Sequence, residues 1–229
     1  MESAFRLSSI IGIVLPVESD SRPRRADAVR NRELVLAAAA EVFAEAGLKG
    51  QVEEVARRAG VGVGTVCRNF PTKQDLVEAV LTSMYETLLE RALQALEQPD
   101  AGVAFEQFFV ALPDFHARHR ALSEQVARAL ELPSSAQPLR EKLTRALTDL
   151  VARAQASGDI RADIGPADIS LLFAGIAHAT SIAGELQPAL RERYVRIILD
   201  GMRPQAGSKL PGKPLDFAQL RRIKQRQAK

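Results

Sequence analysis

Apolar residues recur every three or four positions along most of the chain, which is the repeat of a helix with one buried face. The segment 31–47 shows this most clearly, with Asn31 as a candidate N-cap and Gly47 as the residue that stops the helix. Its apolar stripe consists of Leu34, Val35, Ala38, Ala39, Val42, Phe43 and Ala46. No segment alternates apolar and polar residues as a half-buried strand does, and the sequence contains no internal repeat. The pattern predicts an all-α fold.

The same periodicity divides residues 51–98 into three helices. The first is short and ends at Gly60, and the second covers 63–70, about two turns. Pro71 and Thr72 then mark the start of a long amphipathic helix, because proline is tolerated at a helix start and threonine is a good N-cap.

The second half of the chain continues in the same way. Residues 101–132 predict two helices, the first of which should kink or end near Pro113, because proline removes a helical hydrogen bond. Further helices are expected at 136–158, 166–186 and 188–202. The helix 166–186 is apolar nearly all round and rich in alanine and glycine, so it must be buried on more than one side.

Both ends of the chain differ from this helical middle. The N-terminal end has an apolar run, Ile10–Val17, which is too short to span a bilayer, a task that takes roughly 20 residues. No small-x-small cleavage site follows it, so the run is also a poor signal peptide. From Arg203 onward the chain is rich in Pro, Gly and Lys, with eight basic residues and the single acid Asp216. We expect a flexible N-terminal arm and a flexible basic tail, in which residues 215–227 form about one or two helical turns on contact with an anion.

Composition adds little to this picture but bounds the function. With 46% hydrophobic and 26% charged residues, the chain resembles an ordinary globular protein. The net charge of +3 permits a polyanionic partner without demanding one, so the location of the basic residues matters more than their number. The single cysteine, Cys67, excludes an internal disulfide and fits the reducing cytoplasm, where we expect the protein to reside.

Three glycines, Gly60, Gly62 and Gly64, stand at alternate positions between the two short helices. A phosphate-binding loop would need a preceding strand and the spacing G-x-G-x-x-G or a G-K-[ST] sequence, and neither is present. Two short helices joined by a tight turn are instead typical of a helix-turn-helix, whose second helix enters the DNA major groove. Gly62 and Gly64 would leave the first turn of that helix bare, so that its backbone can approach DNA closely. The alternative is that these glycines only form a tight turn between packed helices.

The segment 31–80 resembles the DNA-binding domain of the TetR family of transcriptional repressors. The resemblance rests on "VEEVARRAGVGVGTVCRNFPTKQDLVEAVL", which follows the family pattern of apolar-Ala-x-x-Ala-Gly-Val, small-x-Gly-Thr, an aromatic residue and Phe-x-x-Lys-x-x-Leu. It implies a three-helix helix-turn-helix domain (26–75) and a helical ligand-binding and dimerisation domain (76–203). The composition of the two ends adds a flexible arm (1–25) and a flexible basic tail (204–229). It also implies a homodimeric repressor that binds a palindromic double-stranded DNA operator and is released by a small-molecule effector.

The resemblance carries roles to single residues of the second short helix and of the start of the long helix that follows it. Thr65 and Lys73 match positions that hold the DNA backbone, Arg68 is the candidate for reading guanine, and Asn69 is the candidate for reading adenine. The alternative for Arg68 and Asn69 is a solvated helix end. The full set of expected DNA-contacting residues is Gln51, Gly62, Val63, Gly64, Thr65, Cys67, Arg68, Asn69 and Lys73.

Two positions depart from the family pattern. Cys67 stands where the family usually has a tyrosine that reaches a DNA phosphate, and a thiol is shorter and a weaker donor. Gln51 stands where the family favours threonine or serine as a helix N-cap, and glutamine caps poorly. The thiol of Cys67 could instead serve only in packing, or it could make the protein a redox-responsive regulator.

The basic residues Arg22, Arg24 and Arg25 precede the first helix. They could lie along a DNA groove or could equally be solvated.

In the C-terminal half, the resemblance implies that the last two helices pair across a two-fold axis. A ligand pocket is implied by analogy, with Gln107 as a possible polar contact and Phe115 as a further wall. The tentative ligand-binding set is Phe105, Phe108, Phe109, His116, Phe173 and His178. Aromatic residues at helical spacing are often ordinary core, which is the alternative for each of them.

Other classes of protein find little support in the sequence. It contains no G-x-S-x-G, H-E-x-x-H, C-x-x-C or Walker lysine, so we expect neither an enzyme nor a cofactor. His116 and His119 are spaced for a metal, but the segment offers no cysteine or paired carboxylate as a third ligand, so no metal site is predicted. The remaining alternative is a helical protein–protein adaptor, which would not need Thr65, Lys73 or a helix bared by glycine.

Overall fold

The computed structural model describes residues 21–118, 135–181, 187–204 and 209–227, and these contain helices and no strand. The all-α prediction is confirmed. The helices are α1 Ser21–Ala46, the short 3-10 helix η1 Gly47–Lys49, α2 Val52–Ala59, α3 Val63–Asn69, α4 Lys73–Glu97, α5 Ala101–Arg118, α7 Gln137–Ala156, α8 Pro166–Ser181, α9 Gln187–Met202 and α10 Phe217–Gln227.

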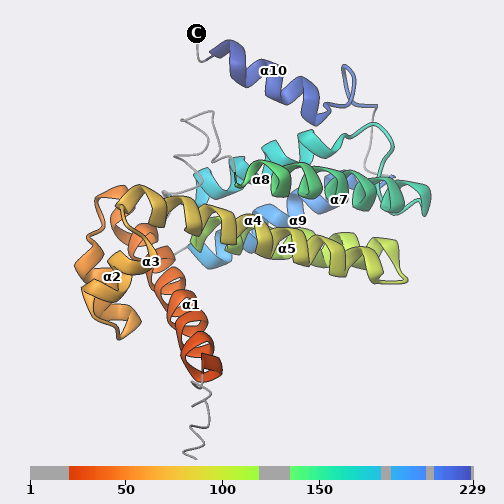
Figure 1. Ribbon diagram of the computed structural model, residues 1–229. Coiled ribbons are helices and arrows are strands. Elements are labelled where there is room, and N and C mark those ends of the chain that lie inside the picture. Colours follow the sequence, from red (N-terminus) through yellow and green to blue (C-terminus); the bar gives the residue numbers. More distant parts are fainter. Residues whose placement is uncertain (1–20, 119–134, 182–186, 205–208, 228–229) are drawn as a thin grey trace, which may run out of the picture.

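The long helix α4 joins two parts of the molecule. At its N-terminal end lie α1, α2 and α3, and its remaining length runs into a bundle formed with α5, α7, α8 and α9 (Figure 1). A single cluster of buried residues extends through both parts, from Val35 in α1 through Leu76 and Leu88 in α4 to Met202 in α9. At the far end of α4, Arg153 of α7 donates hydrogen bonds to the carbonyl oxygens of Leu96 and Gln98. The two parts therefore share one hydrophobic core, and α4 is the element that they have in common.

The boundaries of α2 and α4 follow the predicted signals. Gly60 ends α2 in the left-handed region with φ 67°, a conformation that only glycine adopts at little cost. Thr72 begins α4 with a capping box, in which its hydroxyl accepts from the Asp75 N–H at 3.0 Å and the Asp75 carboxylate accepts from the Thr72 N–H at 2.9 Å. The predicted end at Gly60 and start at Thr72 are confirmed.

Helix α1 is longer than predicted. It begins at Ser21, so Asn31 lies inside the helix and is not its N-cap, and residues 21–25 are helical although we assigned them to a flexible arm. Pro23 falls in the first turn, where proline costs little, and no glycine or second proline interrupts the chain before Gly47. The rest of the predicted arm, residues 1–20, lies outside the described residues.

Helix α5 also continues further than predicted. It passes through Pro113 and extends to Arg118, and the proline is fully buried. Phe109 and Phe115 on either side of it are buried as well, so their packing offsets the hydrogen bond that proline removes. The predicted second helix of the segment 101–132 lies outside the described residues.

The C-terminal tail differs most from expectation. Residues 209–216, which we predicted to be flexible, lie extended against the loop before α8 and are hydrogen-bonded to it. They lead into α10, an 11-residue helix that is longer than the expected one or two turns. Composition could not reveal this contact, because its partners are two aspartates some fifty residues earlier in the chain.

Candidate DNA-binding interface

The two short helices α2 and α3 form a helix-turn-helix that packs on α1 (Figure 1). Helix α2 buries Val55, Ala56 and Ala59, and α3 contributes Val66, which is 1% exposed, while Phe70 at its end is 4% exposed. The guanidinium of Arg32 in α1 lies over the Phe70 ring, 4.6 Å from its centroid, which ties the end of α3 to α1. One side of α3 is therefore fixed in the core and the opposite side is left outward.

The predicted DNA-contacting residues lie on this outward side. Gln51, Gly62, Val63, Gly64, Cys67 and Arg68 are exposed, and Thr65, Asn69 and Lys73 are half-buried. The structure thus brings all nine together over α3 and the adjoining ends of α2 and α4. The side chains of Arg22, Arg24 and Arg25 lie outside the described residues.

Glycine is present at positions 60, 62 and 64 for different structural reasons. Gly60 is required by its positive φ. A Cβ added at Gly62 or Gly64 would meet no atom within 4 Å, and neither residue has a positive φ. The fold itself therefore does not require glycine at positions 62 and 64, so a tight turn between packed helices does not explain them.

Polar side chains along α3 make local hydrogen bonds. The Asn69 amide donates to the Thr65 carbonyl at 2.9 Å, and Arg68 Nη2 donates to Thr65 Oγ1 at 3.2 Å. Arg68 is otherwise exposed and extends the outward surface of the helix. Asn69 is half-buried, and its amide nitrogen is already engaged within the helix.

Residues at the adjoining helix ends complete the surface. Gln51 makes no side-chain cap bond to α2, as its residue type predicts, and its amide donates to the Lys49 carbonyl at 3.0 Å. Lys73 is the first residue of α4, directly after Thr72, so its positive charge stands at a helix N-terminus, where the helix dipole also favours an anion.

Cys67 lies exposed on α3. Packing in the core is therefore not the role of this thiol, contrary to the alternative drawn from its residue type. The redox-sensing hypothesis stays a prediction.

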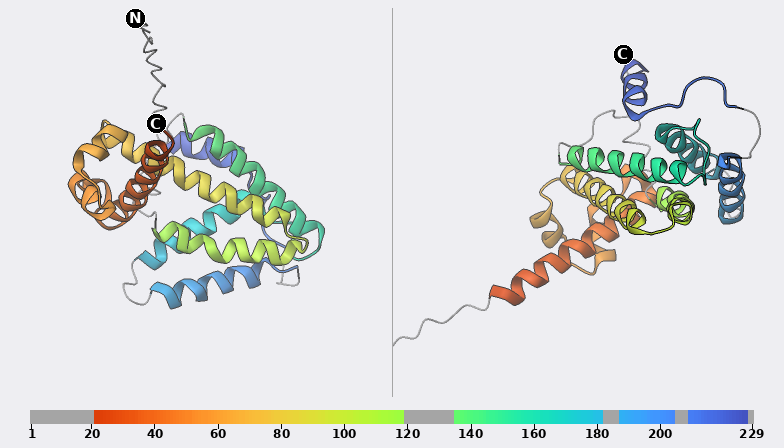
Figure 2. Two further views of the ribbon diagram at one scale, coloured as in Figure 1. Left: turned by 60° about the horizontal axis from the view of Figure 1, so that its bottom comes forward. Right: turned by 90° about the vertical axis from the view of Figure 1, so that its right-hand side faces the viewer.

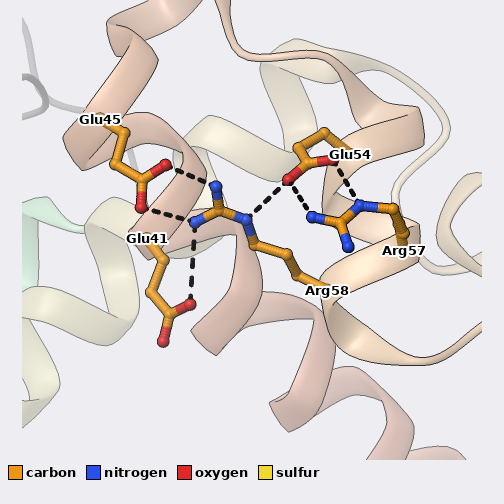
Figure 3. Close-up of polar contacts among 5 residues, drawn as sticks. All are labelled: Glu41, Glu45, Glu54, Arg57 and Arg58. Atoms are coloured by element: carbon orange, nitrogen blue, oxygen red, sulfur yellow. Dashed lines mark hydrogen bonds and ion pairs between the residues drawn. The ribbon is translucent and has the colours of Figure 1, made fainter.

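An ion-pair network, missed in the sequence analysis, fastens α2 to α1 (Figure 3). Arg58 of α2 donates to both carboxylate oxygens of Glu45 in α1, at 2.7 and 2.5 Å, and to Glu54 at 2.8 Å, while Glu41 lies 4.0 Å away. Arg57 pairs only with Glu54, one turn earlier in its own helix. Hydrogen bonds from Arg57 and Arg58 lower the pKa of Glu54 to about 2, and the bond from Arg58 lowers the pKa of Glu45.

One feature of the sequence could have indicated this ion-pair network. Glu41 and Glu45 stand four apart and so share one face of α1, but which of the two arginines faces them depends on how the helices cross.

The phenylalanines proposed for a ligand pocket are all buried, but they fall into two groups. Phe109 packs against Phe105 and Phe173, with ring centroids 5.1 and 3.6 Å apart, so these three form part of the core. Phe108 and Phe115 instead line a cavity of about 220 Å³ between α4 and α5. Its polar lining comes from Arg91, Gln94, Gln98 and Gln107.

The side chains of His116 and His178 lie outside the described part of the chain, as does His119. In the described part, no group of three or more His, Cys, Asp or Glu residues is placed to hold a metal ion. None of the helices described is both long and apolar enough to cross a membrane.

Comparisons with known proteins agree with this geometry. Residues 35–80 match the sequence profile described as bacterial regulatory proteins, tetR family, and residues 100–204 match the transcriptional regulator SbtR-like C-terminal domain. The chain is 27% identical over 194 residues to the HTH-type transcriptional repressor KstR2 of Mycolicibacterium smegmatis, covering 78% of this chain and 93% of that protein.

Solved structures of TetR regulators are also similar to this chain. A TetR transcription regulatory protein from Mycobacterium vanbaalenii is 36% identical, with a TM-score of 0.62 over 79% of this chain and 99% of that one. A TetR transcriptional regulator from Streptomyces coelicolor is 34% identical, also with a TM-score of 0.62, over 76% of this chain and 99% of its own. The helix-turn-helix on α1, the bundle built along α4 and these matches together show that this chain belongs to the TetR family of transcriptional regulators.

Proposed function

We propose that this protein is a homodimeric repressor that places α3 in the major groove of a palindromic operator and leaves the DNA when a small molecule binds its C-terminal domain. The observation that carries the proposal is the two-sided character of α3. Val66 and Phe70 fix one side in the core, and the other side presents two glycines that the fold does not require, together with an exposed arginine. A bare backbone beside a cation is suited to close approach to DNA.

Roles within this surface follow from position and chemistry. Thr65 and Lys73 hold DNA phosphates, because the Thr65 hydroxyl follows the bare start of α3 and the Lys73 ammonium stands at the first residue of α4, just past the end of α3. Arg68 reads a guanine, since a guanidinium can bond its O6 and N7 together. Asn69 is the weaker candidate for base reading, because its amide nitrogen is already bonded to Thr65.

The dimer forms through α8 and α9. These helices leave large apolar side chains in solvent, with Leu171, Leu172 and Ile197 exposed by 44%, 40% and 57%. A second subunit would bury them, in keeping with the nearly all-round apolar character of α8. Binding then requires the two copies of α3 to stand about one DNA turn apart, roughly 34–36 Å.

The effector acts through α4. This helix begins at Lys73 beside the DNA surface, and its second half lines the cavity with Leu88, Arg91 and Ala95. A ligand that fits only one orientation of α4 relative to α5 stabilises that orientation. A change in the orientation of α4 would in turn move α3 in each subunit. Release is then a shift between two dimer populations with different α3 spacing.

The operator test uses DNA fragments of the source genome selected by the full-length protein. We expect a palindromic consensus and strong salt dependence. Lys73→Ala should weaken binding to every sequence and reduce the log–log salt slope by about 0.9 for each phosphate that the variant no longer neutralises. Lys142→Ala removes the same charge from an exposed position on α7 and serves as the control. Selected fragments without a common sequence, or a Lys73→Ala slope equal to wild type, would contradict the proposal.

A further inference from the structure

The chain continues past the domain shared with the family, and this extension is built onto the fold. The family match ends at residue 204, whereas the structure describes residues 209–216, which we call the C-terminal strap, followed by α10. The Leu210 N–H donates to Asp163 Oδ2 at 2.8 Å, and the Leu215 N–H donates to Asp168 Oδ2 at 3.0 Å. Two carboxylates on the loop and first turn of α8 therefore hold the strap at both ends.

A glycine makes room for this contact. A Cβ at Gly165 would lie 2.3 Å from the Leu215 carbonyl oxygen, so the strap lies where only glycine permits it. The Leu215 oxygen in turn accepts from the Ala167 N–H at 3.3 Å. Arg161 also pairs with Asp163 and, by its hydrogen bonds, holds the pKa of that carboxyl well below its usual value, so the acceptor stays ionised. The strap is a fixed part of the surface beside α8.

The strap forms one wall of an apolar groove of about 760 Å³, whose other walls are α8 and α9. Leu210 and Pro211 come from the strap, Leu171 and Leu172 from α8, and Ile197 from α9. The three side chains from α8 and α9 are those that the proposed dimer would bury, so the groove is continuous with that face.

Helix α10 brings an apolar stripe to the same region. Phe217, Leu220 and Ile223 stand at intervals of three, on one side of the helix, and Ile223 is 45% exposed. In Figure 1 and in the right-hand view of Figure 2, the helix lies above α7 and α8, whereas α2 and α3 lie lower, beside α1. Helix α10 contacts α8, whose exposed residues line the groove.

Building on the proposed dimer, we infer that the strap and α10 extend its interface, with the apolar stripe of α10 packed on the partner subunit's α8–α9 surface. A two-fold interface uses the same patch twice, so a subunit that offers both a groove and an apolar helix complements a second copy of itself. The groove and the exposed Ile223 of the α10 stripe, beside the half-buried Phe217 and Leu220, would cover each other in the pair. The extension outside the family domain is thus a dimerisation arm.

The test measures the dimer dissociation constant of full-length protein over a dilution series by mass photometry and sedimentation. Ile223→Glu places a charge in the proposed contact, and because this residue is exposed in the single subunit, folding should be unaffected. We expect the dissociation constant to rise about tenfold or more. Ala218→Glu makes the same change of charge on the opposite, exposed side of α10 and should leave the constant unchanged.

Ile197→Glu, on α9, separates this inference from the proposal on which it rests. If each of the single variants Ile197→Glu and Ile223→Glu dissociates the dimer, the result supports both the proposed dimer and the dimerisation arm. Dissociation by Ile197→Glu alone leaves the dimer in place and overturns the arm. A wild-type protein that is monomeric at micromolar concentration overturns both. Binding of wild-type protein to phosphatidylglycerol vesicles, abolished in Ile223→Glu while the dimer constant stays the same, would assign the stripe to a membrane and also overturn the arm.

Discussion

At the scale of single residues, the glycines around α3 separate two requirements that the sequence shows as one pattern. The fold requires glycine at position 60 because this residue has a positive φ. At Gly62 and Gly64, by contrast, there is free space where a side chain would begin. Their spacing predicted a DNA-facing helix, but only the geometry shows which of the three the fold needs.

This difference predicts opposite effects of alanine. Gly64→Ala lies inside α3 and should raise the free energy of unfolding by about 0.5–1 kcal/mol, because alanine is the better helix former. It should nevertheless weaken operator binding about tenfold or more, since its methyl group would separate the helix from DNA. Gly60→Ala should instead lose about 1–2 kcal/mol of stability from the left-handed conformation. Chemical denaturation and fluorescence anisotropy measure the two effects, and an unchanged affinity of Gly64→Ala would remove the close approach.

The paired arginines of α2 allow a second contrast. Arg58 reaches across to Glu45 of α1, while Arg57 pairs only within α2 and has a side chain 71% exposed. Arg58→Ala should lower the thermal midpoint by a few degrees and weaken operator binding without changing its salt slope, because it positions α3 and touches no phosphate. Arg57→Ala should lower the thermal midpoint less than Arg58→Ala does, because Arg57 is largely exposed and pairs only within α2, and it should leave operator binding unchanged. A reduced salt slope in Arg58→Ala would reassign this residue to the DNA contact.

The same network sets a pH dependence of stability. The pKa of Glu54 is about 2 in the folded protein against an ordinary value of 4.5. A lowered carboxyl pKa stabilises the fold above the ordinary value, and the contribution is lost as the pH falls through the folded one. Arg58→Ala removes the hydrogen bond that lowers the pKa of Glu45 and one of the two that lower the pKa of Glu54. The stability difference between wild type and this variant should therefore be complete above pH 4.5 and shrink as the pH falls below it. Thermal unfolding of the two proteins at about pH 7 and about pH 3 measures it, and a difference that grows in acid would contradict this origin.

At the scale of elements, helix existence was predictable and helix extent was not. Local signals fixed the end of α2 at Gly60 and the start of α4 at Thr72, because a left-handed glycine and a capping box act within one turn. Pro23 and Pro113 misled the prediction, since the cost of proline depends on its place in the helix and on the packing around it. The outward set on α3 was predictable because the family resemblance covers residues 31–80 and assigns these positions to the DNA-facing side of the helix. The strap and the Arg58 network depend on partners distant in the chain, which periodicity cannot reveal.

The strap gives a prediction at this scale. Gly165→Ala would place a Cβ 2.3 Å from the Leu215 oxygen, so the strap must leave its position. Proteolysis within residues 209–216 should become markedly faster, because the backbone loses its hydrogen bonds to the loop before α8. Gly201→Ala, where a Cβ would meet nothing within 4 Å, serves as the control. Equal cleavage rates in the two variants would show that the strap is not held at Gly165.

At the scale of the whole molecule, α4 connects the proposed DNA-binding part and the proposed ligand-binding part through one hydrophobic core. Its first turns pack with α1, and its later turns pack with α5 and α7, all within one continuous set of buried residues. A ligand between α4 and α5 therefore acts on a helix that follows α3 after three residues and packs on α1, the helix that α3 also contacts. The proposed release from DNA needs only two settings of this one helix.

The undivided core has a consequence for building hybrid regulators. Fusing another effector domain after residue 75, the end of the sequence-defined DNA-binding unit, would cut α4 just before Leu76, Val77, Val80 and Leu81, all of which are buried. The transferred DNA-binding domain would lose these buried side chains, which complete its hydrophobic core. A biosensor made from this protein therefore has to exchange its parts inside α4, beyond Leu81, and match the rotation of the incoming helix at the joint.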